Sequence, residues 1–257
     1  MAKLIAITGK GGVGKTTISA LLIKNLLESG KSPVLAIDAD PNSCLDAALG
    51  VNVTETVGRA REDVRASKQT GSVNSSGAGA GANISTRELL RLKIESALVE
   101  SKGFDLIAMG RPEGEGCYCY ANNVLKEVIS EISASYPYVV LDNEAGLENL
   151  SRRIVQKVDI LVLVSDASNA GLQTLIRLYE LADEMKMSYG KLAIVINKLR
   201  GGKLPDRAAE IKGKIKADII IGLPDDEEAA IFAEESKCFL EIPATNPVYK
   251  KIGELLI

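Results

Sequence analysis

A glycine-rich loop directly after an apolar strand is the feature that most constrains how this chain can fold. Residues 6–17 read AITGKGGVGKTT and fit the pattern G-x-x-x-x-G-K-[ST] from Gly9 to Thr16. In such a loop the glycines let backbone N–H groups wrap the phosphates, a lysine reaches the β- and γ-phosphates, and a hydroxyl ligates Mg²⁺. The pattern assigns the last two roles to Lys15 and Thr16, and it predicts that a helix begins near Lys15.

The same glycines also fit a second pattern, the G-x-G-x-x-G of dinucleotide sites, with Asp38 near the place of the acid that binds ribose. A dinucleotide site has no use for a lysine and a hydroxyl directly after the last glycine, whereas a Mg-bound triphosphate needs both. The loop therefore favours a nucleoside triphosphate. The loop residues predicted to bind it are Gly9, Lys10, Gly11, Gly12, Val13, Gly14, Lys15, Thr16 and Thr17.

Size and composition favour a single cytosolic domain around this loop. A chain of 257 residues can bury one full α/β core, so we expect one domain over residues 1–257. The net charge of −3 and the isoelectric point of 5.3 argue against a general affinity for nucleic acid or anionic membranes. The sequence has no run of about 20 apolar residues and no leader-like start, so we expect a cytoplasmic protein without stable membrane association.

Apolar runs of strand length alternate with helical patterns along the chain. The expected strands are 4–8, 34–37, 104–108, 138–141, 160–164, 193–196 and 218–221, and the expected helices are 16–28, 87–100, 124–132, 172–185 and 205–215. Continuous apolar strands separated by helices are typical of a parallel sheet covered on both faces. The predicted fold class is therefore α/β, with a doubly wound, mainly parallel sheet, helices on both faces and a phosphate-binding loop.

Residues 67–83 interrupt this alternation. They are rich in glycine, alanine and serine and have little to bury, so we expect a flexible loop between the second strand and the helix at Arg87. A tolerated linker and a lid or partner-binding loop are the two interpretations, and the composition favours the linker.

Three carboxylates follow predicted strands and indicate the chemistry of the site. Asp38 and Asp40 lie two residues apart after strand 34–37, and alternate residues of an extended segment point the same way. Beside a Mg-bound triphosphate such acids hold metal-bound water or orient the attacking water. Asp142 ends strand 138–141, as expected of a Walker-B aspartate that holds Mg²⁺ directly or through water. The predicted Mg²⁺ ligands are Thr16, Asp40 and Asp142, and the predicted catalytic residues are Lys10, Lys15, Asp38, Asp40 and Asp142.

Two further strand ends carry candidate nucleotide contacts. Gly146 would let the turn after Asp142 approach the γ-phosphate and act as a switch, unless the turn is an ordinary link to a helix. Asn197 and Lys198 follow strand 193–196, where an asparagine amide can pair with the edge of adenine. Guanine readers of the N-K-x-D type add an aspartate, and this chain has Arg200 there. The pattern thus favours adenine, with a turn-forming asparagine as the alternative.

Lys10 is an additional lysine inside the loop, where an ordinary nucleotide hydrolase needs only one. Together with residues 10–17, the acids after two strands and the 197–198 pair, it resembles the deviant-Walker ATPases, which include the nitrogenase iron protein, MinD and chromosome-partition ATPases. The resemblance covers essentially the whole chain. It implies ATP as the nucleotide, and a homodimer in which the lysine matching Lys10 reaches the partner's nucleotide.

A pair of cysteines indicates a soft-metal site. Cys117 and Cys119 lie two residues apart after strand 104–108, and the chain contains no histidine to complete a site with them. Two-fold symmetry would bring four thiolates together from one motif, and four thiolates suit Zn²⁺ or Ni²⁺. Redox thiols and packing cysteines are the alternatives. Cys44 and Cys238 are expected to be structural.

This C-x-C motif, with the G-x-P-E run and the asparagine around it, resembles the CooC-type carbon monoxide dehydrogenase maturation ATPases and their acetyl-CoA synthase relatives. The resemblance implies an ATP-hydrolysing dimer that binds nickel or zinc between its subunits and assists nickel insertion into one of those client enzymes. Asn149 stands where that family has a histidine, which affects the switch but not the metal pair. A spatial regulator of the MinD or partition type and an iron–sulfur electron-transfer ATPase remain as alternatives.

Overall fold

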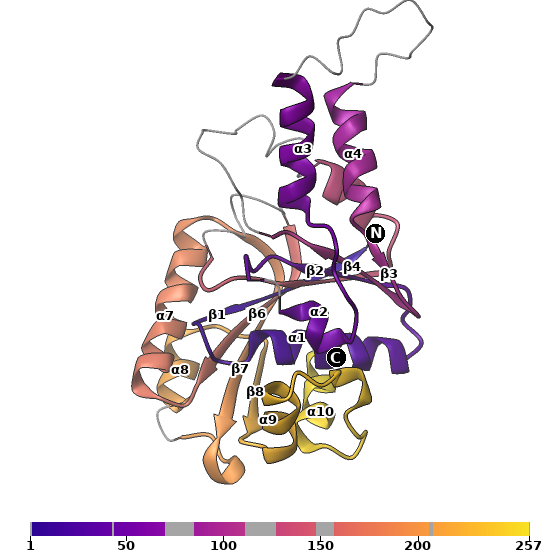
Figure 1. Ribbon diagram of the computed structural model, residues 1–257. Helices are drawn as coiled ribbons and strands as arrows, with labels where there is room; N and C mark the ends of the chain where they lie inside the picture. Colours follow the sequence, from indigo (N-terminus) through magenta and orange to yellow (C-terminus); the bar gives the residue numbers. More distant parts are fainter. Residues whose placement is uncertain are drawn as a thin grey trace, which may run out of the picture.

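The computed structural model describes residues 2–42, 44–69, 85–110, 127–147, 157–205 and 208–256. Within these ranges the chain forms an eight-stranded sheet in the order β3-β4-β2-β5-β1-β6-β7-β8 (Figure 1). Neighbouring strands are parallel, except that β3 and β4 are antiparallel, and this confirms the predicted fold class. The strands are β1 (Lys3–Gly9), β2 (Val34–Asp38), β3 (Val99–Glu100), β4 (Phe104–Ala108), β5 (Tyr138–Asp142), β6 (Lys157–Asp166), β7 (Ser188–Leu199) and β8 (Ile219–Pro224).

Helices cover both faces of the sheet, each over its own hydrophobic cluster. One face carries α1 (Lys15–Glu28), α2 (Leu45–Leu49), α9 (Glu227–Glu234) and α10 (Pro247–Ile252), and the other carries α3 (Val57–Gln69), α4 (Thr86–Ser96), α7 (Asn169–Glu184), α8 (Ala208–Lys214) and a helix at 127–133. Short 3₁₀ turns lie at Arg200–Gly202, Phe239–Glu241 and Gly253–Leu256. Among the described helices, none combines the length and the apolar character needed to cross a membrane.

The continuous apolar strands follow from this two-sided burial. All residues of β2 are buried, and in β1 successive side chains enter opposite clusters: Leu4 and Ala6 one, Ile5 and Ile7 the other. A strand with both faces covered therefore has no polar face, and its sequence reads as an unbroken apolar run.

The strand order reverses direction at β1, which pairs with β5 on one side and β6 on the other. In open parallel sheets the loops that leave such a reversal diverge to opposite faces, and the crevice between them binds ligands at the carboxyl ends of the strands. The glycine-rich loop starts at this point, so the topology places it at the crevice.

Three predicted boundaries need correction. The helix expected over 87–100 ends at Ser96, because Val99–Glu100 pairs with β4 as an edge strand, and residues 101–103 form the turn between them. The first residues of the loop expected over 67–83 are helical instead, since α3 continues to Gln69; residues 70–84 lie outside the described ranges. The helix expected over 124–132 is described from residue 127 to 133. The helices α2, α3, α9 and α10 were not predicted.

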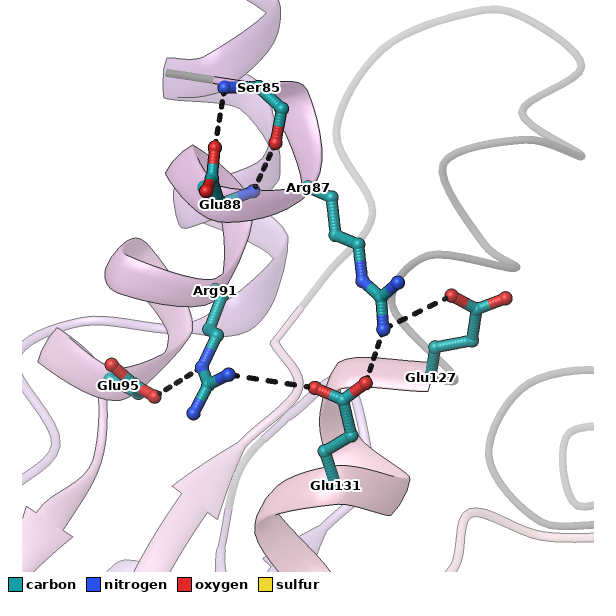
Figure 2. A network of polar contacts seen from close by, with 7 residues as sticks. All are labelled: Ser85, Arg87, Glu88, Arg91, Glu95, Glu127 and Glu131. Atoms are coloured by element: carbon teal, nitrogen blue, oxygen red, sulfur yellow. Dashed lines mark hydrogen bonds and ion pairs between the residues drawn. The ribbon is translucent and has the colours of Figure 1, made fainter. Parts of the chain in front are cut away.

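The helices α3 and α4 pack side by side and project from the sheet (Figure 1). A capping box begins α4: the Ser85 hydroxyl accepts from the Glu88 N–H, and the Glu88 carboxylate accepts from the Ser85 N–H. Figure 2 shows two arginines of α4 turned toward the helix at 127–133, which follows the segment containing the cysteine pair. The ion pairs join Arg87 to Glu127 and Glu131, and Arg91 to Glu95 and Glu131. All these side chains are about half exposed, so each pair adds at most about 1 kcal/mol.

Candidate active site

The glycine-rich loop lies between β1 and the first turn of α1, as predicted. Gly14 is the residue before the helix, with φ 92°, and the helix begins at Lys15. The loop borders a cavity of about 600 Å³, whose wall includes Gly11, Gly12, Gly14, Lys15, Thr16 and Thr17. The positive end of the α1 dipole therefore faces the cavity, as an anion site requires.

The lysine at the start of α1 is held inside the loop. Lys15 is 9% exposed, and its Nζ donates to the carbonyl of Lys10 at 3.3 Å. One turn on, the Ser19 hydroxyl lies 3.0 Å from the Lys15 carbonyl and 3.0 Å from Asp142 Oδ1. Ser19 thus joins α1 to the end of β5. Sequence reasoning missed this serine, although a polar residue in the apolar face of the helix was a visible signal.

Asp142 lies behind the loop at the end of β5. Burial raises the pKa of its carboxyl to about 6, while hydrogen bonds from the Thr16 and Ser19 hydroxyls and the charge of Lys15 act in the opposite direction. The Thr16 hydroxyl, the Asp142 carboxylate and the nearby Asp40 carboxylate are the hard oxygen donors that Mg²⁺ prefers. The three predicted Mg²⁺ ligands therefore have the right chemistry for that ion, and the Thr16–Asp142 contact brings two of them together.

The two acids after β2 occupy different positions. Asp38 is 1% exposed: its Oδ1 accepts from the Asp40 N–H at 3.0 Å and its Oδ2 from the Leu45 N–H at 2.9 Å. Burial raises the pKa of Asp38 to about 7, and these N–H bonds oppose the rise. Asp40 lies in the wall of the cavity. The structure thus places Asp38 under the loop that carries Asp40, where it fixes the shape of that loop.

The turn after β5 is fastened through one carbonyl group. Gly146 has φ 95°, a conformation that favours glycine, and its carbonyl accepts from Thr8 Oγ1 at 2.8 Å and from Asn143 Nδ2 at 2.9 Å. Glu144 and Ala145 of this turn line the cavity. The predicted switch segment therefore lies at the site and is tied to β1 through Thr8. The role of Thr8 was not predicted; the available signal was a hydroxyl residue in an otherwise apolar strand.

The residue pair at the end of β7 faces the loop. Asn197 Nδ2 donates to the Val13 carbonyl at 2.9 Å, and Lys198 Nζ donates to the Gly12 carbonyl at 3.1 Å. Both residues also line the cavity. The asparagine amide has a second N–H and a carbonyl oxygen, so the bond to Val13 leaves base contacts open to it.

The far end of the cavity is built by a segment that sequence reasoning did not identify. Pro224 ends β8, Asp225 and Asp226 follow it, and alanines of α9 continue the wall. Asp226 Oδ1 caps α9 by accepting from the Ala229 N–H at 2.9 Å, and it also accepts from Asn246 Nδ2 at 2.8 Å. Asn246 is 2% exposed and caps α10, so it locks this end of the cavity to the C-terminal helix. A strand end followed by adjacent acids was the available signal.

The additional lysine of the loop points elsewhere. Lys10 is exposed and is not among the residues that line the cavity. The hydrogen bond from the Ser168 hydroxyl lowers the pKa of Asp166, and the charges of Lys10 and Lys198 lower it further, which places Lys10 near the end of β6. The action of Lys10 on a partner's nucleotide therefore stays a prediction.

The cysteine pair, Cys117 and Cys119, lies outside the described residues. Within the described ranges no group of three or more metal-binding side chains is present. Cys44 is exposed at the start of α2, and Cys238 packs against Gly50. The metal prediction therefore stays a prediction.

A phosphate-binding loop at the reversal of a parallel sheet, with buried acids at two adjacent strand ends, defines a P-loop ATPase. A family model described as an AAA domain matches residues 2–194. The model covers three quarters of the chain, so the chain belongs to this AAA-domain family.

Individual relatives refine the comparison. An uncharacterized ATP-binding protein of Methanocaldococcus jannaschii is 40% identical over 98% of this chain and 96% of the relative. The carbon monoxide dehydrogenase accessory protein CooC of Rhodospirillum rubrum is 31% identical over 91% of each chain. The structure of the MinC:MinD cell division complex of Aquifex aeolicus matches with a TM-score of 0.69 and 22% identity, covering 99% of this chain and 93% of that one; this likeness shows the fold.

Proposed function

We propose that this protein is a nucleotide-switched, dimeric ATPase that assists nickel insertion into carbon monoxide dehydrogenase or acetyl-CoA synthase. The observation that carries the proposal is the near full-length similarity to the CooC accessory protein, combined with an assembled site for the phosphates and Mg²⁺. The net charge of −3 also favours a protein client over nucleic acid.

The chain's own residues divide the work of ATP hydrolysis. The loop N–H groups and Lys15 hold the phosphates, and Mg²⁺, when bound through Thr16, Asp142 and Asp40, offsets their charge. Asp40 lies in the cavity wall and orients the attacking water, while Asp38 holds its loop in place. Lys10 acts across the dimer on the partner's nucleotide.

The nucleotide state is transmitted by the turns after β2 and β5. Gly146 presents its N–H to the γ-phosphate while its carbonyl stays on Thr8. Release of the γ-phosphate frees this turn, and the Ala39 N–H bond to the Asp142 carbonyl passes the change to the neighbouring strand. Met109 donates its N–H to the Asp38 carbonyl, so the strand that leads to the cysteine pair is joined to the same loops.

Nickel or zinc is the cargo of this switch. Cys117 and Cys119 of each subunit supply half of a four-thiolate site on the dimer axis. Coupling requires that the metal bind one nucleotide state more tightly than the other. The sign of that difference determines whether ATP binding loads the metal or releases it.

The test is a double substitution, Cys117→Ser with Cys119→Ser, compared with Cys44→Ser and Cys238→Ser as a matched control. We expect the first pair to abolish nickel- and zinc-induced dimerisation, measured by light scattering on anaerobic protein, while ATP binding survives. The control pair should dimerise as the wild type does. Unchanged metal stoichiometry in the first pair would remove the metal proposal.

A spatial regulator of the MinD type is the second candidate, because the fold is shared with MinD. Such a regulator needs a membrane anchor or a basic surface. The apolar residues of α10 and the turn after it, Val248, Tyr249, Ile252 and Leu255, are buried in the core and so are not free to form an anchor. Co-sedimentation with liposomes and with DNA in the presence of ATP separates the candidates, since strong binding to either favours the regulator. A visible-range spectrum of anaerobic protein tests the iron–sulfur alternative.

A further inference from the structure

Two side chains at the end of β7 hold two successive carbonyl groups of the glycine-rich loop. Lys198 Nζ donates to the Gly12 carbonyl at 3.1 Å, and Asn197 Nδ2 donates to the Val13 carbonyl at 2.9 Å. The C=O and N–H of a trans peptide point in opposite directions. Each of these bonds therefore turns the next N–H of the loop away from β7 and toward its inner side, where a bound phosphate needs donors.

The end of β7 is distorted in the way this arrangement requires. In a regular strand, adjacent residues point to opposite faces of the sheet, so Asn197 and Lys198 would not both reach one loop. The pairing of β7 with β8 shifts register between Ile196 and Leu199, and Lys198 has φ 56°. A lysine rarely adopts this left-handed conformation. The distortion brings both side chains to the same loop.

The contact between Gly14 and Asn197 leaves no room for a side chain at position 14. A Cβ added to Gly14 would lie 2.6 Å from Asn197 Nδ2. The amide is thus packed directly against the loop backbone. Lys198 beside it is exposed, and its amine donates to the Gly12 carbonyl.

We infer that Lys198 is a positioning residue: it holds the glycine-rich loop in the shape that receives phosphates, and it acts on the nucleotide through Gly12. The inference rests on the proposed ATP site and goes beyond the base-reading role that the sequence predicts for the 197–198 pair. It makes a distinct claim about specificity. Lys198 should matter for any ligand that carries the polyphosphate, whether or not a base is attached.

The variant Lys198→Asn tests this claim, because asparagine tolerates the left-handed conformation and its side chain is too short to replace the amine at Gly12. Lys186→Asn is the matched control: Lys186 is another exposed lysine, with φ 51°, and lies in the turn just before β7 begins. The probes are Mg-ATP and Mg-tripolyphosphate, each competing with a fluorescent ATP analogue. We expect Lys198→Asn to weaken both by the same factor, about three- to tenfold, and Lys186→Asn to change neither.

Deuterium uptake by a peptide covering residues 9–15 gives a second readout in protein without nucleotide. The loop should exchange faster in Lys198→Asn than in the wild type. Exchange in Lys186→Asn should equal that of the wild type. Exchange in Lys198→Arg should be close to that of the wild type, because arginine keeps a donor.

Three results would overturn the inference. Weaker ATP binding with unchanged tripolyphosphate binding would assign Lys198 to the base or ribose, and unchanged binding and exchange would remove any role. Equal losses in Lys186→Asn would show a general effect of losing a left-handed lysine. A wild-type chain that binds neither probe would instead refute the proposed ATP site, which the variants alone do not test.

Discussion

Replacing Gly14 by alanine tests the packing between the glycine-rich loop and β7. The new Cβ would lie 2.6 Å from Asn197 Nδ2, and the residue would keep a φ of 92° that side chains disfavour. The conformation costs roughly 1–2 kcal/mol. Displacing the amide also breaks its bond to the Val13 carbonyl, which adds about 1 kcal/mol. We therefore expect the free energy of unfolding to fall by about 2–3 kcal/mol.

Urea unfolding of four variants measures this cost and divides it. Gly11→Ala is the matched control, because a Cβ at Gly11 meets nothing within 4 Å and its φ is not in the left-handed range. In an Asn197→Ala background the clash is absent, so Gly14→Ala should cost about 1 kcal/mol less than in the wild type. Equal unfolding free energies for Gly14→Ala and Gly11→Ala, or strict additivity with Asn197→Ala, would refute this account of the loop.

Three further predictions concern other parts of the site and the core. Thr8→Val removes one of two donors to the Gly146 carbonyl; it should lower the free energy of unfolding by about 1 kcal/mol in urea and reduce kcat more than ATP affinity. Lys10→Ala should bind ATP as tightly as the wild type, measured by fluorescence titration, and should lose most of its ATP hydrolysis. Wild-type turnover in this variant would show that Lys10 is an ordinary surface lysine. The Lys24 hydrogen bond is the main cause that lowers the pKa of Glu28, so Glu28 stabilises the fold above its unfolded pKa and the contribution is lost as pH falls. Glu28→Gln should flatten the stability–pH curve below about pH 5, and an unchanged slope would contradict it.

The sheet was predictable because a strand that is buried on both faces needs apolar residues at every position. Every residue of β2 is buried, and an unbroken apolar run is the result. The loop at residues 9–17 was predictable because phosphate binding restricts both the glycines and the residues that follow them. The signal is weaker for α9, which has eight residues and none fully buried, although Ala229 and Phe232 pack partly buried against the core. The edge strand at Val99–Glu100 depends on pairing with β4, which no local pattern reveals.

The site was less predictable than the fold, since spacing does not determine how a loop turns. The two-residue spacing of Asp38 and Asp40 is compatible with a shared site, but the chain bends so that Leu45 donates its N–H to Asp38. In the same way, the distortion at Lys198 overrides strand alternation. The first effect comes from backbone N–H groups in the loop that follows Asp38. The second involves a hydrogen bond between segments far apart in the sequence.

Native mass spectrometry of anaerobically purified protein, with nickel and a non-hydrolysable ATP analogue, tests the central proposal most directly. The account predicts a dimer that carries one nickel ion for two chains, with the ion lost when Cys117 and Cys119 are replaced by serine. A monomer with its own ion, or a nucleotide-bound dimer that retains no metal, would contradict it.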